Sequence, residues 1–304
     1  MLLLTGASGY VGRHLLAYLK SGDNSVALPD GDILPVWRSH EVPGGVQLDL
    51  CDADAIDGVF TGHRISAIIH LAAEARTGIC ERDPKLAVAG NVDATRNLLN
   101  ACEKQGAAGQ PLPYFLYTST DMVFRGDQAP YTAENATDAV SAYGRSKADT
   151  EELVRQYNGQ WAIVRPALIY GPPYGGRVSV VSSTLEAIRS GHGAFFEDEL
   201  RTPVFVKDLT RLIGAMVTQR MEGIVNAGGP DRVSRYDFAL AVANACGISG
   251  EKVNRGLIGD DPAHAWRPRD ISMISDQAHG LVEFTRLAEG LHQTARDGEG
   301  GVGN

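Results

Sequence analysis

The chain has 304 residues, of which 43% are hydrophobic and 21% are charged. This composition is typical of a globular protein and excludes disorder as its main state. The formal net charge is −9, from 37 acidic and 28 basic side chains, and no basic run occurs, so we expect no nucleic-acid partner.

The sequence predicts neither a membrane segment nor a metal site. Hydrophobic runs such as Ile68–Ala73 are far shorter than the ~20 residues that a bilayer requires. No basic segment precedes the apolar N-terminus, so we expect no secretory signal. The four cysteines form no CxxC pair and the eight histidines no HExxH pattern, so we expect no protein-built metal site and no disulfide. This cysteine usage fits a cytoplasmic protein.

Short apolar runs alternate with amphipathic stretches through the first half of the chain. The alternation predicts an α/β fold, namely a doubly wound parallel sheet of the Rossmann type with helices on both faces. The predicted strands are Met1–Thr5, Leu34–Trp37, Gly45–Leu48, Ala67–Leu71, Tyr114–Thr118 and Trp161–Arg165. The predicted helices are Tyr10–Lys20, Lys85–Lys104 and Ala142–Tyr157.

The second strand has an alternative in Ser25–Leu28, which lies closer to the first helix. The choice matters because ligands of doubly wound sheets bind where the strands end. With Leu34–Trp37 as the strand, Arg38 and Ser39 take that place. With the alternative strand, Asp30 takes it.

After Arg165 the alternation loosens, and glycine and proline become denser. Asp208 is expected to cap one helix of this second half. Ser234 and Asp237 are expected to form a capping box for another, which ends at Gly247. We therefore predict a Rossmann domain over residues 1–165, a smaller α/β substrate-binding region over 166–292 and a flexible tail over 293–304.

The segment directly after the first strand carries glycines at three-residue spacing, at Gly6, Gly9 and Gly12. Glycines let the backbone turn tightly and approach a phosphate closely. Free N–H groups at the start of the next helix, and the positive end of its dipole, favour negative charge. A purely structural turn is the alternative, but the position at the first strand–helix junction favours a dinucleotide site.

Tyr143 and Lys147 are four residues apart on a predicted helix, which puts them on one face about 6 Å apart. Because an ammonium stabilises phenolate, we expect the pKa of Tyr143 to fall from ~10 toward neutrality, where tyrosine works as a general acid or base. A surface pair is the alternative. The hydroxyls of Thr118, Ser119 and Thr120 end a predicted strand, where ligands bind in such sheets.

Together these motifs resemble the extended short-chain dehydrogenase/reductase family over nearly the whole chain. The resemblance extends to Asp49 after the third strand, Asn91 in a helix, Ile69–Ala73 and Arg165–Pro172. Within the family the chain is most similar to the dTDP-4-dehydrorhamnose reductase branch, which also contains the regulatory β-subunit of methionine adenosyltransferase. The segments that carry this similarity are Ser119–Gly126, Pro130–Glu134, Val206–Asp208 and Arg267–Asp270.

The resemblance implies a role for each matching residue. Thr120 would hold a carbonyl oxygen, Tyr143 would donate a proton to it, and Lys147 would bind the cofactor's ribose. Thr120, Asp121, Arg177 and Arg267 would contact the substrate, the arginines through a phosphate or carboxylate. We expect cofactor contacts from Gly6, Ser8, Gly9, Tyr10, Val11, Gly12, Arg38, Ser39, Asp49, Leu50, Leu71, Ala72, Ala73, Asn91, Thr118, Lys147, Pro166, Ala167 and Leu168.

The chain departs from the rhamnose-forming branch at Gly78, which stands where that branch usually has an aspartate. It departs from the family's dehydratases at Met122, since these enzymes typically have glutamate there. A thioether exchanges no proton near neutral pH, so elimination lacks one of its two catalysts.

We therefore predict an NAD(P)H-dependent reductase that acts on the ketone of a small molecule. The ketone would be a sugar-nucleotide 4-keto group or another secondary-metabolite ketone. Arg38 favours NADP as cofactor, and NAD is the alternative. A sugar-nucleotide epimerase or dehydratase, and a cofactor-binding regulatory subunit without turnover, are the alternative functions. The sequence leaves a homodimer open.

Overall fold

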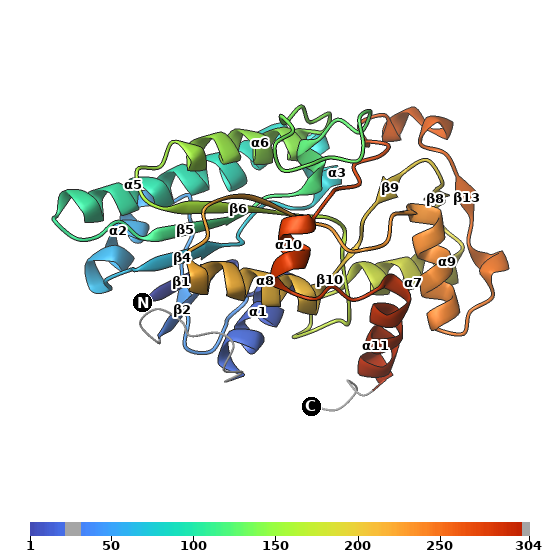
Figure 1. The fold of residues 1–304 in the computed structure, drawn as a ribbon, viewed down its shortest axis with the longest axis horizontal. Helices are drawn as coiled ribbons and strands as arrows, with labels where there is room; N and C mark the ends of the chain where they lie inside the picture. Colours follow the sequence, from blue (N-terminus) through green and yellow to red (C-terminus); the bar gives the residue numbers. More distant parts are fainter. Residues whose placement is uncertain (22–31, 300–304) are drawn as a thin grey trace.

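The computed structural model describes residues 1–21 and 32–299, and its centre is a parallel sheet with the strand order β11-β6-β5-β4-β1-β2-β3. The predicted doubly wound α/β fold is confirmed, as Figure 1 shows. The strands are β1 Leu2–Thr5, β2 Ile33–Trp37, β3 Val46–Gln47, β4 Ala67–His70, β5 Tyr114–Thr118, β6 Trp161–Pro166 and β11 Gly223–Ala227.

Helices cover both faces of this sheet. Successive side chains of a strand point to opposite faces, so Leu2 and Leu4 join one core layer and Leu3 joins the other, all three fully buried. Each such leucine contributes roughly 1.5–3 kcal/mol through burial. The first layer contains α1 (Tyr10–Lys20) and α8 (Val206–Gln219), and the second contains α2 (Ala53–Gly62), α5 (Ala94–Ala107) and α6 (Ala142–Arg155).

The second strand of the sheet is β2, which pairs in parallel with β1. Of the two candidates from the sequence, Leu34–Trp37 is therefore confirmed as a strand of this sheet. The alternative, Ser25–Leu28 with Asp30, lies outside the described residues. Arg38 and Ser39 follow β2 directly, at the edge of the sheet where the parallel strands end.

The predicted helix over Lys85–Lys104 is confirmed as helical throughout, and a π turn divides it into three consecutive pieces. They are α4 (Pro84–Ala87), a π-helical turn η1 (Val88–Asp93) and α5. Gly90 lies in the π turn against Glu74, and a Cβ there would come within 3.2 Å of the Glu74 Cβ. The wider turn therefore brings this helix close to the segment after β4. In the first half of the chain, the helices α2 and α3 (Thr77–Arg82) were not predicted.

The second half of the chain adds two-stranded pairings beside the main sheet. These are β7 (Ile169–Tyr170) with β10 (Val204–Phe205), β9 (Leu200–Arg201) with β12 (Val233–Ser234), and β8 (Phe195–Phe196) with β13 (Arg255–Gly256). The helices are α7 (Val180–Ser190), α9 (Arg235–Ala245), α10 (Asp276–Leu281) and α11 (Leu287–Glu299). Single 3-10 turns lie at η2 (Asp121–Val123), η3 (Gly250–Lys252), η4 (Ile258–Asp260) and η5 (Pro262–His264).

Of the two helix N-caps predicted in this half of the chain, that of α9 is confirmed and that of α8 is wrong. Ser234 and Asp237 form the predicted capping box of α9. Asp208 does not cap α8, because that helix begins at Val206. Its carboxylate accepts hydrogen bonds from Thr285 instead. The domain boundary at residue 165 stays a prediction, and strand β11 enters the main sheet from beyond it.

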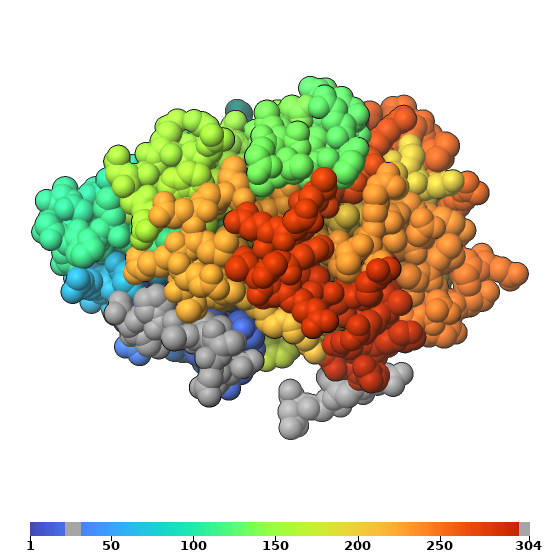
Figure 2. Space-filling model, in the orientation of Figure 1, coloured from blue at the N-terminus to red at the C-terminus, as the bar shows by residue number. Residues whose placement is uncertain are grey.

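The C-terminal segment packs against the segment that follows β5. Figure 2 shows its red residues against the green segment that follows β5, where the backbone of Tyr131 bonds to Ser272 and Ile274. Helix α11 extends through Glu299, so it includes the first residues of the predicted tail. In the described part of the chain, no helix is long and apolar enough to cross a membrane.

Candidate active site

Two adjoining cavities lie where β1, β4, β5 and β6 end. The larger, of about 550 Å³, follows the glycine loop and the ends of β2 and β4. The smaller, of about 320 Å³, lies beyond it at the ends of β5 and β6. Ala75 lines both, so the two cavities meet there.

The glycine loop is built for close approach of a ligand's phosphates. Gly6 has φ +67°, and a Cβ there would lie 2.7 Å from the amide nitrogen of Ala72. A Cβ on Gly12 would lie 2.2 Å from the Gly6 carbonyl oxygen. Gly9 is the N-cap of α1, and no described side chain caps this helix. Gly9 and Tyr10, at the start of this helix, line the cavity, and a helix N-terminus at this place suits a dinucleotide diphosphate.

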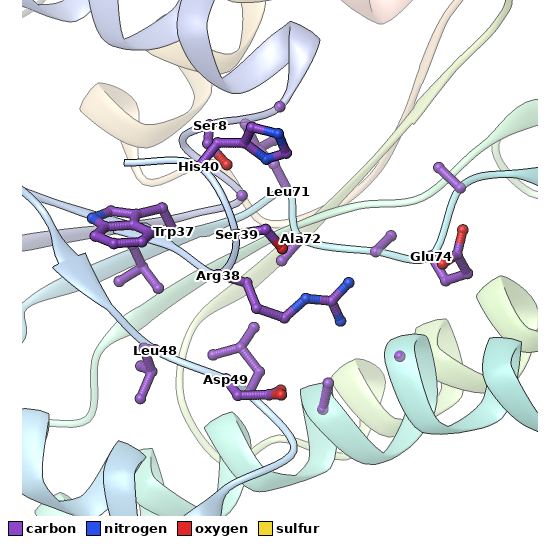
Figure 3. A pocket seen from close by; sticks show the side chains of 18 of the residues that line it. Ser8, Trp37, Arg38, Ser39, His40, Leu48, Asp49, Leu71, Ala72 and Glu74 are labelled. Carbon is purple, nitrogen blue, oxygen red and sulfur yellow. The ribbon is translucent and has the colours of Figure 1, made fainter. Parts of the chain in front are cut away.

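Most of the expected cofactor residues line the larger cavity. Figure 3 shows the Arg38 side chain extending into it, with Asp49 on one side and Ala72 and Glu74 beyond. Among the described residues the Arg38 guanidinium has no ion pair. The predicted residues that line this cavity are Gly6, Ser8, Gly9, Tyr10, Arg38, Ser39, Asp49, Leu50, Leu71, Ala72 and Ala73.

Other expected cofactor residues lie elsewhere. Ala167 and Leu168 line the smaller cavity. Gly12 permits the close packing of α1 on the glycine loop. The remaining expected cofactor residues line neither cavity. They are Val11, Gly12, Asn91, Thr118, Lys147 and Pro166.

His70 is a structural residue in this arrangement. The Thr5 hydroxyl lies 2.6 Å from its Nδ1, and its Nε2 lies 2.9 Å from the Thr95 hydroxyl. Thr95 in turn donates to the Asn91 carbonyl, so His70 donates from Nε2 and accepts at Nδ1. Burial lowers the pKa of His70 to about 3, which keeps this neutral form. Thr5 also accepts from the Ala72 amide, so the chain of hydrogen bonds fixes the cavity wall.

Asn91 also positions other groups. Its Oδ1 accepts from the Glu74 amide at 2.8 Å, and its Nδ2 donates to the Ser146 hydroxyl at 2.8 Å. Ser146 lies between Tyr143 and Lys147 on α6 and donates to the Tyr143 carbonyl. Asn91 thus links the cavity wall to α6, and its expected contact with a cofactor stays a prediction.

Thr120 and Tyr143 come together because η2 packs tightly on the start of α6. Gly144 makes this possible, since a Cβ there would lie 2.1 Å from the Met122 carbonyl oxygen. Thr120 and Tyr143 both line the smaller cavity, and the Thr120 hydroxyl donates to Asp121 at 3.1 Å. The Lys147 ammonium donates to the Thr118 carbonyl at 2.7 Å and lies 4.2 Å from the centre of the Tyr117 ring.

The expected lowering of the Tyr143 pKa was wrong for the protein without ligand. Burial, with the charge of Asp121, raises the Tyr143 pKa well above its usual value. Burial also lowers the pKa of Lys147 to about 7, while Glu151 acts in the opposite direction. The Lys147 charge is therefore partly lost near neutral pH, and Tyr143 remains a neutral phenol, the form that donates a proton.

The smaller cavity holds charged side chains that the sequence analysis did not identify. Glu199 and Arg201 are almost fully buried and bonded to each other at 3.0 Å. Arg201 also lies 3.8 Å from Asp121, whose pKa burial raises to about 6. Arg235 comes from the first residue of α9. The sequence contains no local motif that identifies Glu199, Arg201 or Arg235. They line the cavity only because β9 and the start of α9 fold against it.

Two arginines of this cavity keep buried N–H groups without a described partner. They are Nη1 of Arg235 and Nε of Arg267. Arg267 also donates to Glu199 at 3.1 Å and lies over the Trp266 ring. The predicted substrate residues Thr120, Asp121 and Arg267 thus share one cavity.

Arg177 lies apart from these residues. It was expected to contact the substrate, but it lines the larger cavity, and its Nε donates to the Ser8 carbonyl at 2.7 Å. The segment after β7 folds back over the glycine loop and carries it there. No group of three potential metal ligands occurs in the described residues, and the absence of a metal site stays a prediction.

Comparisons with known proteins agree with this arrangement. The family described as RmlD substrate binding domain matches residues 1–296. The chain is 28% identical to methionine adenosyltransferase 2 subunit beta from Xenopus laevis, over 96% of this chain and 86% of the relative. It is 28% identical to dTDP-4-dehydrorhamnose reductase from Mycobacterium tuberculosis (strain CDC 1551 / Oshkosh), over 94% and 88% of the two chains.

The fold is also found among solved structures. The dTDP-4-dehydrorhamnose reductase from Bacillus anthracis str. Ames, solved in complex with NADP, has a TM-score of 0.80 and 23% identity over 97% of this chain and 98% of its own. The expected resemblance to extended short-chain dehydrogenase/reductases is confirmed. The protein thus belongs to the RmlD substrate binding domain family.

Proposed function

We propose that this protein is an NADPH-dependent reductase of an anionic ketone. The observation that carries the proposal is the junction of the two cavities. A neutral Tyr143 phenol and the Thr120 hydroxyl line a cavity that meets, at Ala75, the one formed by the glycine loop. A reductase needs this arrangement, because the hydride donor and the proton donor must reach the same carbonyl.

The residues of the smaller cavity supply the proton chemistry. When bound, the nicotinamide supplies the hydride to the carbonyl carbon. Thr120 donates a hydrogen bond to the carbonyl oxygen, and Tyr143 transfers its phenolic proton to that oxygen. The resulting phenolate favours the charged form of Lys147, which raises the lysine pKa from about 7.

The wall of the larger cavity supports NADPH over NADH. Arg38 and Ser39 follow β2, where Rossmann folds contact the ribose 2′ position. The Arg38 guanidinium suits a 2′-phosphate, because it offers planar paired donors and retains its charge. The Bacillus anthracis relative was solved with NADP.

The charges of the smaller cavity support an anionic substrate. The cavity is lined by three arginines and two carboxylates, which together give one net positive charge. They are Arg201, Arg235, Arg267, Asp121 and Glu199. Arg235 and Arg267 each retain a buried N–H group for a ligand. A sugar nucleotide carrying a 4-keto group meets this requirement, and the name of the Mycobacterium relative supports that class.

A second candidate is a cofactor-binding regulatory subunit without turnover. It is favoured by the 28% identity to methionine adenosyltransferase 2 subunit beta over 96% of this chain. Elimination is disfavoured, because Met122 lines the smaller cavity where a second acid–base group would be required.

The test is a stoichiometry measurement with added NADPH. The protein is incubated with phosphorylated, nucleotide-linked and carboxylated ketones, and both NADPH loss and alcohol formation are quantified. We expect one NADPH oxidised per alcohol formed. Product without net NADPH loss would indicate an epimerase, and tight NADPH binding with no product from any ketone would indicate the regulatory function.

A further inference from the structure

The segment Pro172–Arg177, here called the strap, connects β7 to the region before α7 and lies against the glycine loop. His14 Nε2, on α1, donates to the Pro172 carbonyl at 3.2 Å. The Tyr174 ring lies 4.9 Å from the His14 ring, centre to centre. A Cβ on Gly175 would lie 2.3 Å from the Arg13 side chain. These contacts hold the strap to the helix whose N-terminus faces the larger cavity.

The strap places Arg177 beside the glycine loop in one defined orientation. Its backbone amide donates to the Tyr174 carbonyl at 3.1 Å, which closes a turn at the end of the strap. Its side-chain Nε donates to the Ser8 carbonyl at 2.7 Å. The guanidinium lines the cavity with Ser8, Gly9 and Tyr10. In the described structure its two terminal nitrogens have no hydrogen-bond partner and no ion pair.

We infer that Arg177 binds the diphosphate of the dinucleotide and completes the site begun by the glycine loop. This inference rests on the proposed function. The loop offers backbone N–H groups and a helix dipole but no full positive charge, whereas a diphosphate carries two negative charges. A guanidinium fixed through Nε leaves its terminal N–H groups free for a phosphate oxygen.

The position distinguishes Arg177 from Arg38, the other unpaired arginine of this cavity. Arg38 follows β2, where Figure 3 shows it near Asp49, on the side expected for the adenosine ribose. Arg177 lies at the glycine loop, on the side expected for the diphosphate. Loss of Arg177 should therefore weaken every dinucleotide, and loss of Arg38 should weaken only ligands that carry a 2′-phosphate.

The test measures dissociation constants by calorimetry for NADPH, NADH and 2′-AMP, which has a 2′-phosphate but no diphosphate. We expect Arg177→Gln to raise the constants for NADPH and NADH by the same factor, about 10- to 100-fold, and to leave 2′-AMP unchanged. Arg38→Gln should raise those for NADPH and 2′-AMP and spare NADH. Arg177→Lys should restore part of the affinity, because it keeps the charge but not the fork.

The control is Arg189→Gln, an exposed arginine in the last turn of α7, which should leave all three constants unchanged. Unaltered NADPH binding by Arg177→Gln overturns the inference. So does an equal loss of 2′-AMP binding, which would mean that the substitution acts through the fold. If the wild-type protein binds neither dinucleotide, the proposed function itself is wrong.

Discussion

Burial acts in opposite directions on the two ionisable groups of the Tyr143–Lys147 pair. It raises the pKa of the phenol and lowers that of the ammonium, and both changes favour the uncharged form. In the protein without ligand, Tyr143 is therefore a neutral phenol that can donate its proton. A negative charge near Lys147 would raise the pKa of the lysine and favour its charged form. This differs from the simple lowering of the tyrosine pKa that the spacing of the two residues predicts.

Tyr143→Phe tests the proton donor. The ring and its packing remain and only the hydroxyl is lost, so the NADPH dissociation constant should stay within a few-fold of wild type. The rate of ketone reduction should fall by roughly 10²- to 10⁴-fold, the usual contribution of a general acid. Steady-state rates and a binding titration check both values. A variant that retains more than about a tenth of the rate would contradict the assignment.

Lys147 also predicts a pH dependence of stability. Its pKa is about 7 in the folded protein and 10.5 when unperturbed, so the unfolded chain binds more protons between these values. The free energy of unfolding should therefore gain a favourable contribution as pH rises from about 7 toward 10.5. Thermal unfolding of Lys147→Met should lack this gain. Identical pH profiles for the variant and wild type would show that burial does not shift this lysine.

Arg235 predicts a selective effect on substrate binding. Arg235→Gln removes a buried N–H donor and the net positive charge of the cavity. We expect kcat/KM for a carboxylated ketone to fall about 10- to 100-fold, while that for its neutral amide analogue changes little. Equal losses for both ketones would mean that Arg235 supports the cavity and does not recognise an anion.

At the scale of elements, the sequence predicts regular strands and helices well and irregular ones poorly. Helix α1 and strand β5 have the predicted bounds, because apolar periodicity and the glycine loop mark them clearly. No residue pattern in the sequence predicts the π turn of η1. Its Gly90 packs against Glu74, and the two residues meet only in the folded protein.

Asn91 makes that π turn testable. Asn91→Leu would leave the Glu74 amide and the Ser146 hydroxyl without the partner they now have. Chemical denaturation should show a loss of about 1–3 kcal/mol in the free energy of unfolding. Asn100→Ala, an exposed site on α5, is the control and should change stability little. A variant as stable as this control would contradict the positioning role of Asn91.

At the scale of the whole molecule, the site joins segments that no local pattern connects. The glycine loop, Tyr143 and Lys147 could be predicted, because each motif is read within a few residues. Arg201 and Arg235 could not, because only the pairing of β9 with β12, the strand before α9, brings them into one cavity with Thr120. The position of Arg177 could not be predicted for the same reason, since only the folded strap shows which cavity it reaches.

Hydride transfer is the central claim, and isotope transfer measures it most directly. NADPH carrying deuterium at both C4 positions of the nicotinamide is incubated with the protein and the ketone panel, and the alcohols are analysed by mass spectrometry. The account predicts one deuterium on the new carbinol carbon with wild type, and only background label with Tyr143→Phe. Saturating NADPH binding without label in any alcohol would contradict it.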